Sequence, residues 1–186
     1  MRTYCKLRVI SVGFFMSQPK SQNRMHSLLG GAGALACAVI PLTFSPAAAM
    51  APIIVSGMVD IHFGSFTESG AGGTVVINPA GGRTVGGAVM EVGGGGLEQR
   101  GRFNVTGSTG MAMDVDVTPT SVTISNGGDT MVVNNFNLIT VGGGDSATIT
   151  LAAASSQYYI GATLVVGAGQ ASGTYSGNYT LTVNYQ

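Results

Sequence analysis

The last fourteen residues, Gly173–Gln186, read GTYSGNYTLTVNYQ. From Tyr175 to Tyr185 one parity holds apolar residues or glycine, and the other holds Ser, Asn and Thr. This period of two predicts a β-strand with one buried and one solvated face. Chain termini are usually loose unless they are tied down. The pattern therefore predicts that the terminal strand pairs, either with the molecule's own sheet or with another chain.

The first 49 residues differ from the rest of the chain. They contain basic residues, no acidic residue and an apolar stretch from Leu28 to Phe44. Ala47 and Ala49 then supply an A-x-A cleavage pattern. A membrane anchor is the poorer interpretation, because Pro41 and several glycines interrupt a run shorter than the roughly 20 apolar residues of a span. The sequence predicts a signal peptide, residues 1–49, and a protein exported to the periplasm, the cell surface or the extracellular space.

Two details of this leader stay open. It is long before its apolar core, and a start of translation at Met16 or Met25 would give a more ordinary charged region. Cys37 follows a small residue, as in lipoproteins, but no leucine stands three residues before it. Lipidation of Cys37 is therefore a second alternative to simple cleavage.

Cleavage after Ala49 leaves residues 50–186, which we expect to form a single domain. Both cysteines and every lysine leave with the leader, so the mature protein has no disulfide. Three arginines then face eight acidic residues, a net charge of −5. We expect no nucleic-acid partner, because no basic patch is left to meet phosphates. We also expect no stable membrane span once the leader is removed.

Strand patterns fill the mature chain, and Gly, Asn, Asp, Ser and Pro separate them. No window shows a convincing helical period. Turn residues every 8–12 positions are typical of a β-sandwich. We predict an all-β fold, an immunoglobulin-like (pilin-like) sandwich of about nine antiparallel strands. The strand patterns are Ile53–Phe63, Thr74–Asn78, Ala88–Val92, Leu97–Thr106, Met111–Thr118, Val122–Ile124, Met131–Thr140, Ala147–Leu151, Tyr158–Val166 and Tyr175–Tyr185.

No catalytic constellation emerges from the residues. His62 is the one histidine left after cleavage, and we expect it on the protein surface. Asp114 and Asp116 alternate with apolar residues, which favours the solvated face of a strand over a carboxylate pair for catalysis. Gly167–Gly173 resembles a nucleotide loop, but a strand rather than a helix follows it. We expect no enzyme, no cofactor and no metal site.

Two stretches, Val59–Gly87 and Tyr159–Gln186, carry a family resemblance. The marks are Phe63-Gly64-Ser65-Phe66, the turn through Asn78-Pro79 and Gly81-Gly82-Arg83-Thr84, and the closing G-x-Y-x-G-x-Y-x-L-T-V-x-Y. With the stretch between them, they resemble the exported bacterial family known as domain of unknown function 4402. The resemblance covers almost all of the mature chain and implies no established activity.

The tail also resembles spore-coat-U-like proteins and subunits of chaperone–usher pili. Those subunits often end with a penultimate tyrosine, here Tyr185, and a glycine fourteenth from the end, here Gly173. The resemblance implies a last strand that pairs with a chaperone or with the next subunit. The implied partners are the protein itself or related subunits, and a periplasmic chaperone. The residues expected to mediate pairing are Gly173, Tyr175, Tyr179, Leu181, Val183 and Tyr185 of the tail, and Val55, Val59, Ile61 and Phe63.

This sequence departs from the pilin pattern in two ways. Many pilins carry a disulfide, which the mature chain lacks. Ala51–Phe63 has room to be either a donor strand or the first strand of the sandwich, but hardly both. The leading hypothesis is a structural or adhesive cell-surface subunit that assembles by β-strand addition. The alternative is a secreted monomeric binding module that acts through its loops, with Gly93–Arg102 and Gly142–Asp145 as candidates.

Overall fold

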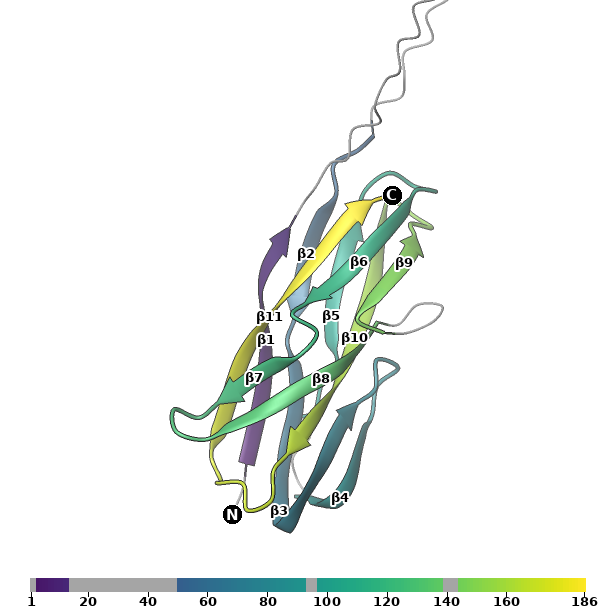
Figure 1. Ribbon diagram of the computed structural model, residues 1–186. Helices are drawn as coiled ribbons and strands as arrows, with labels where there is room; N and C mark the ends of the chain where they lie inside the picture. The colour runs from purple at the N-terminus through teal and green to yellow at the C-terminus, as the bar shows by residue number, and fades with distance from the viewer. Residues whose placement is uncertain (1–2, 14–49, 93–96, 139–143) are drawn as a thin grey trace, which may run out of the picture.

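The computed structural model describes residues 3–13, 50–92, 97–138 and 144–186, and these form an elongated all-β molecule (Figure 1). The described residues contain no helix, so the prediction of an all-β class is confirmed. They form eleven strands: β1 Thr3–Gly13, β2 Ile54–Val59, β3 Ile61–Ile77, β4 Arg83–Glu91, β5 Gly101–Thr106, β6 Ala112–Thr118, β7 Val122–Ser125, β8 Thr130–Leu138, β9 Ser146–Thr150, β10 Ser155–Val166 and β11 Thr174–Tyr185.

Six of these strands close into a ring. Its order is β10, β8, β7, β11, β1 and β3, and the pairing of β3 with β10 closes it. The other strands extend the ring: β5 and β2 follow β10, β4 follows β3, and β6 and β9 follow β11. The described residues thus hold eleven strands where about nine were predicted for residues 50–186: ten lie in that segment and pair antiparallel to one another, and the eleventh, β1, precedes it and runs parallel to β11.

The strands differ from the prediction in number and in bounds. First, Thr3–Gly13 forms a strand inside the segment predicted to be a leader. Second, the pattern Ile53–Phe63 breaks at Asp60, and its second half continues into Thr74–Asn78 as the single 17-residue strand β3. Gly64, Gly70 and Gly72 have positive φ in that strand. Left-handed backbone at glycine allows β-bulges, so β3 bends and continues where turn residues suggested a break.

Alternation along β11 matches the faces expected from the sequence. Tyr175, Tyr179, Leu181, Val183 and Tyr185 are buried. Ser176 and Asn178, on the other parity, are exposed. Gly177 belongs to the inward parity, and a Cβ there would lie 2.7 Å from Ile124 Cγ2 of the neighbouring strand β7. Ile124 therefore fills the ring interior at this level and leaves no room for a side chain at position 177 of β11.

Two predicted turns are confirmed. Between β3 and β4, the Gly81 amide donates to the Asn78 carbonyl at 2.9 Å, and the Asn78 amide donates to the Gly82 carbonyl at 3.0 Å. Between β7 and β8, the Asn126 side chain accepts hydrogen bonds from the amides of Gly128 and Asp129. Asn stabilises turns through such local bonds.

In the described part of the chain, no helix is long and apolar enough to cross a membrane.

Candidate functional site

The site of interest is the strand position that β1 occupies, bounded by Ile61–Phe66 of β3 and Thr174–Thr182 of β11. We call it the β1 position. On one side β1 runs parallel to β11, from Tyr4 beside Thr174 to Gly13 beside Thr182. On the other side β1 runs antiparallel to β3, from Thr3 beside Phe66 to Leu7 beside Ile61. The ring is continuous between β3 and β11 only through β1.

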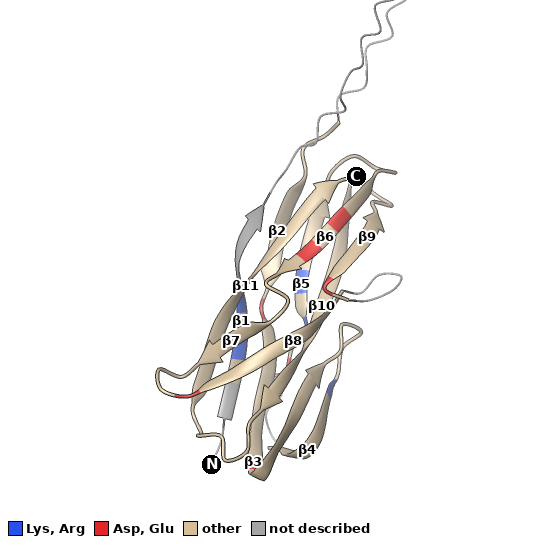
Figure 2. Cartoon of the chain, viewed as in Figure 1, with Lys and Arg blue, Asp and Glu red and all other residues tan. Residues whose placement is uncertain are grey.

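Side chains in the middle of β1 alternate between the core and the surface. Cys5 and Leu7 are fully buried, while Arg8 is exposed. Burial raises the pKa of the Cys5 thiol to about 12. Lys6, between the two buried residues, places its Nζ 2.8 Å from Asp60 Oδ2. Figure 2 shows this basic stretch of β1 lying among strands that carry little charge.

The β3 side of the position is shaped by Arg83 of β4. Arg83 Nη1 donates to the Phe63 and Ser65 carbonyls, each at 3.2 Å. The register between β1 and β3 shifts at this point, so the bulge takes Phe63 out of line with β1. Gly64 has a φ of +74°, and a Cβ there would collide with Arg83 Nη1. Two sequence motifs of the family resemblance thus contact each other: Phe63–Phe66 forms the bulge, and Arg83 of Gly81–Thr84 binds its carbonyl groups.

Charges cluster where β2 passes into β3. Asp60 separates the two strands and pairs with Lys6. His62 is half-buried rather than on the surface, because its backbone bridges to Gln99 on one side and is in register with Lys6 on the other. Burial, with Lys6 adding to it, lowers the pKa of His62 despite the opposing effect of Asp60. Burial and the Asp60 charge also raise the pKa of Tyr179.

The far end of β11 is tied to the residues that precede β2. Tyr185 Oη donates to the Ala51 carbonyl at 2.8 Å and accepts from the Ser108 amide at 2.6 Å. The Ala51 amide in turn donates to Ser108 Oγ at 2.7 Å. The penultimate tyrosine therefore closes a contact within this chain. At the other end of β11, Gly173 packs against the side chain of Asn126, which a Cβ would approach to 3.0 Å.

The structure divides the predicted pairing residues into two groups. Tyr175, Tyr179 and Leu181 of β11 lie beside β1 on one side, and Ile61 and Phe63 of β3 lie on the other. Gly173, Val183 and Tyr185 lie beyond the residues of β11 that pair with β1. Val55 and Val59 lie elsewhere, because β2 pairs with β5. The segment Ala51–Phe63 therefore forms neither a single donor strand nor a single first strand. Its first part pairs with β5 as β2, and its last residues form a wall of the β1 position as the start of β3.

Sequence reasoning missed β1 itself. The signal was present, because Cys5, Leu7 and Val9 alternate with Lys6 and Arg8. Interpretation of the basic residues as part of a leader hid this strand pattern. Several predicted residues lie outside the described part of the chain: Ala47 and Ala49, the alternative starts Met16 and Met25, Cys37, and positions 93–96 and 142–143 of the candidate binding loops.

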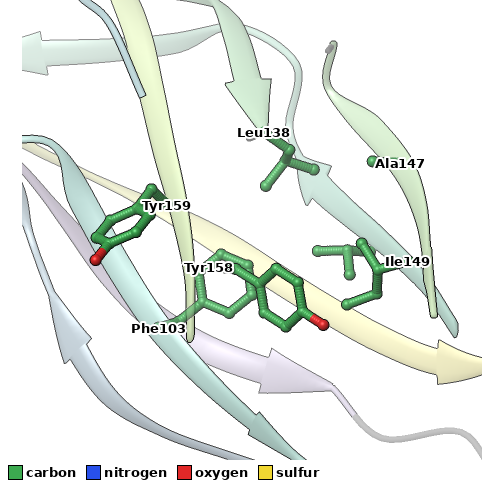
Figure 3. Close-up of a pocket in the computed structure, with 7 residues that line it drawn as sticks. Phe103, Leu138, Ala147, Ile149, Tyr158 and Tyr159 are labelled. Atoms are coloured by element: carbon green, nitrogen blue, oxygen red, sulfur yellow. The ribbon is translucent and has the colours of Figure 1, made fainter. Parts of the chain in front are cut away.

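Some hollows of the molecule lie outside the β1 position. Figure 3 shows apolar side chains gathered between β9 and β10, where Tyr158 points toward Ile149 and Tyr159 points away. Phe103 and Tyr158 stack there with ring centroids 5.7 Å apart, and no room for a water molecule is left. A cleft of about 520 Å³ is lined by Phe66–Gly70 of β3 and by part of the β10–β11 loop. It adjoins the end of the β1 position at which Thr3 pairs with Phe66.

Glu68 and Asp114 have structural partners. Glu68, beside that cleft, accepts hydrogen bonds from the amides of Gly72 and Gly70, and these bonds, the Gly72 bond first, lower its pKa. Asp114 and Asp116 lie on the more open face of β6, as predicted, and Asp114 accepts from Thr148 and Gln186. Among the described residues, no three His, Cys, Asp or Glu side chains lie together in a way that could hold a metal ion.

The β1 position offers two backbone ladders, a buried apolar face and one carboxylate, a combination that binds an extended strand. Comparison with curated proteins and with solved structures finds no match. The similarity of the tail to spore-coat-U-like proteins and pilin subunits therefore stays a prediction. A family model does match residues 53–185, which include both walls of the β1 position but not β1. The chain belongs to the family described as Domain of unknown function (DUF4402).

Proposed function

We propose that this chain is the precursor of an exported structural or adhesive cell-surface protein, and that residues 50–186 are a subunit that assembles by β-strand addition. The observation that carries the proposal is the place of β1. A segment predicted to leave with the leader occupies an interior strand position of the ring, with Cys5 and Leu7 fully buried. Loss of the leader would leave that position empty.

An empty β1 position is energetically unfavourable. Neighbouring strands lie about 4.8 Å apart, so removal of one strand leaves roughly 10 Å between β3 and β11. Both edges would carry unpaired backbone groups, and unpaired edges readily add a strand from another chain. The buried side chains next to the gap, among them Phe63 and Tyr179, would lose cover. A strand supplied by a partner restores both the ladders and the apolar contacts.

The finer description of the fold belongs to the same proposal. Without β1 the ring opens between β3 and β11. The remaining ten described strands then form the two faces of an immunoglobulin-like, pilin-like sandwich with one missing strand. Two features support this arrangement: the alternation of buried side chains on both faces of the core, and the position of the gap beside the terminal strand β11.

The test compares the chain with and without β1. Size-exclusion chromatography with light scattering and thermal unfolding are measured on residues 1–186, on residues 50–186, and on residues 50–186 refolded with a Thr3–Gly13 peptide. We expect residues 50–186 alone to polymerise or to unfold at a lower temperature, and the peptide to restore a stable monomer. Residues 50–186 that remain monomeric, melt like the full chain and ignore the peptide would refute strand addition. That outcome would favour the monomeric binding module instead.

A second readout follows the strand directly. In the Cys37→Ser chain, Cys5 is the remaining thiol, and its burial should block alkylation while β1 is in place. We expect slow alkylation of the folded chain and fast alkylation once β1 is displaced. Fast alkylation of the folded full chain would mean that β1 does not occupy the ring in solution.

A further inference from the structure

We propose that the strand that replaces β1 comes from a separate polypeptide, runs parallel to β11, and carries a basic residue between two inward apolar residues that pairs with Asp60. This inference rests on the proposed function and names the chemistry of its partner. The partner is thus an extended segment of the pattern apolar–basic–apolar.

The direction follows from the register of β1. The pairs Lys6–Ser176 and Arg8–Asn178 place β1 parallel to β11, while Leu7 beside Ile61 places it antiparallel to β3. A strand in the opposite direction would have to make the opposite ladders on both sides. Parallel and antiparallel ladders present their donors and acceptors at different spacings, so the edges that fit β1 favour one direction.

The apolar–basic–apolar pattern follows from burial. Cys5 and Leu7 are fully buried, and each stands beside glycine on one side, Gly64 of β3 or Gly177 of β11. Lys6 points to the other face, where its side chain keeps 38% of its exposure. A replacement strand must therefore carry apolar residues at the two inward positions and a residue that tolerates water between them.

The basic residue follows from Asp60. Its carboxylate is mostly covered, with 20% of the side chain exposed, and its ion pair is with Lys6 of β1. Loss of β1 removes that cation from beside a half-buried carboxylate, which is unfavourable. The acidic balance of residues 50–186, three arginines against eight acidic residues, adds a general preference for a basic partner.

The chain's own mature N-terminal segment does not fit this description. Met50–Val59 contains no basic residue. Ala51 is held by Tyr185 and Ser108, and β2 is paired with β5. A second copy would have to break these contacts to donate its segment, and would leave Asp60 without a cation. The donor is therefore a different polypeptide.

The test is peptide exchange on the full chain. A specific protease site is placed between residues 13 and 50 in the Cys37→Ser chain, which is folded and then cut, so that β1 stays bound without a covalent link. Displacement of fluorescently labelled β1 by competitor peptides is followed to equilibrium. The competitors are the Thr3–Gly13 sequence, its Lys6→Glu and Arg8→Glu variants, and Met50–Phe63.

We expect Lys6→Glu to weaken competition about five- to tenfold, as for loss and reversal of a partly exposed ion pair. Arg8→Glu changes the charge equally at an exposed position and should change competition less than about twofold. In an Asp60→Lys protein the preference should reverse in favour of the Lys6→Glu peptide. Equal effects of the two charge variants, or stronger competition by Met50–Phe63, would overturn the proposed donor chemistry while leaving strand addition intact. Failure of every peptide, Thr3–Gly13 included, would overturn both proposals.

Direction has its own test. In a Cys5→Ala, Cys37→Ser background, a donor with Arg8→Cys should form a disulfide with Asn178→Cys, because neighbouring strands bring the two Cα atoms to about 4.8 Å. Thr174→Cys, four residues away on the same strand and also exposed, is the matched control. Preferential cross-linking to position 174 would show another direction or register and would contradict the proposal.

Discussion

The substitution Tyr185→Phe removes one oxygen atom from the end of β11. Tyr185 is 7% exposed, and its hydroxyl both donates to the Ala51 carbonyl and accepts from the Ser108 amide. Phenylalanine keeps the ring and its packing. The change therefore isolates the hydroxyl that joins the last strand to the segment preceding β2.

The magnitude follows from the two hydrogen bonds. Each contributes about 0.5–1.5 kcal/mol net, so their joint loss should lower the free energy of unfolding by about 1–3 kcal/mol. For a domain of this size, 1 kcal/mol shifts the melting temperature by about 2–4 °C. We expect Tyr185→Phe to melt about 2–12 °C below the parent chain.

The assay is urea and thermal unfolding followed by circular dichroism, with Tyr159→Phe as the matched control. Tyr159 donates its hydroxyl to Gln157 at an exposed site, and its ring over Arg100 is kept in the variant. The control should change stability by less than about 0.5 kcal/mol. Equal stability changes in the two variants would refute the conclusion that Tyr185 ties down the chain end.

Three further predictions concern stability. Arg83→Lys should destabilise the chain by about 1–3 kcal/mol in urea unfolding, because one ammonium group cannot replace both Nη1, which donates to the Phe63 and Ser65 carbonyls, and Nε, which donates to Glu91. An unchanged midpoint would contradict the role given to Arg83. Gly161→Ala should prevent folding or lower the melting temperature severely, since its Cβ would collide with the Ile77 carbonyl. Gly128→Ala is the control and should be tolerated, because the atom nearest to its Cβ would be Asn126 Oδ1 at 3.8 Å. Similar expression and melting of the two variants would refute this prediction. The raised pKa of Tyr179 means that above pH 10 the unfolded chain loses the phenolic proton while the folded chain keeps it. The free energy of unfolding should therefore fall as pH rises, and it should fall less steeply in Tyr179→Phe. An equal slope in the two chains would contradict this prediction.

Local pattern was enough to predict several strands and the buried face of the last one. Alternation from Tyr175 to Tyr185 correctly identified a strand and the side chains that it buries. Turn chemistry at Pro79–Gly82 and Asn126–Asp129 was also confirmed. These features depend on neighbours within a few residues, which the sequence displays directly.

The same reasoning could not predict which strands pair with each other. Period two gives the face of a strand but not its neighbour, so the division of Ile53–Phe63 between β5 and the β1 position could not be read from it. The contact of Arg83 with the β3 bulge joins residues 18 and 20 apart. The hydroxyl of Tyr185 reaches Ala51 across 134 positions.

By itself the sequence determined that the chain is all-β, that its last strand buries its tyrosines, and that residues 53–185 match the family. Only the tertiary structure decided that the terminal strand's parallel neighbour comes from Thr3–Gly13, and that β3 is the strand beyond it. The physical reason is that a strand's face is a local property of side-chain alternation, whereas its neighbour is chosen by backbone hydrogen bonds and burial between segments far apart in the chain.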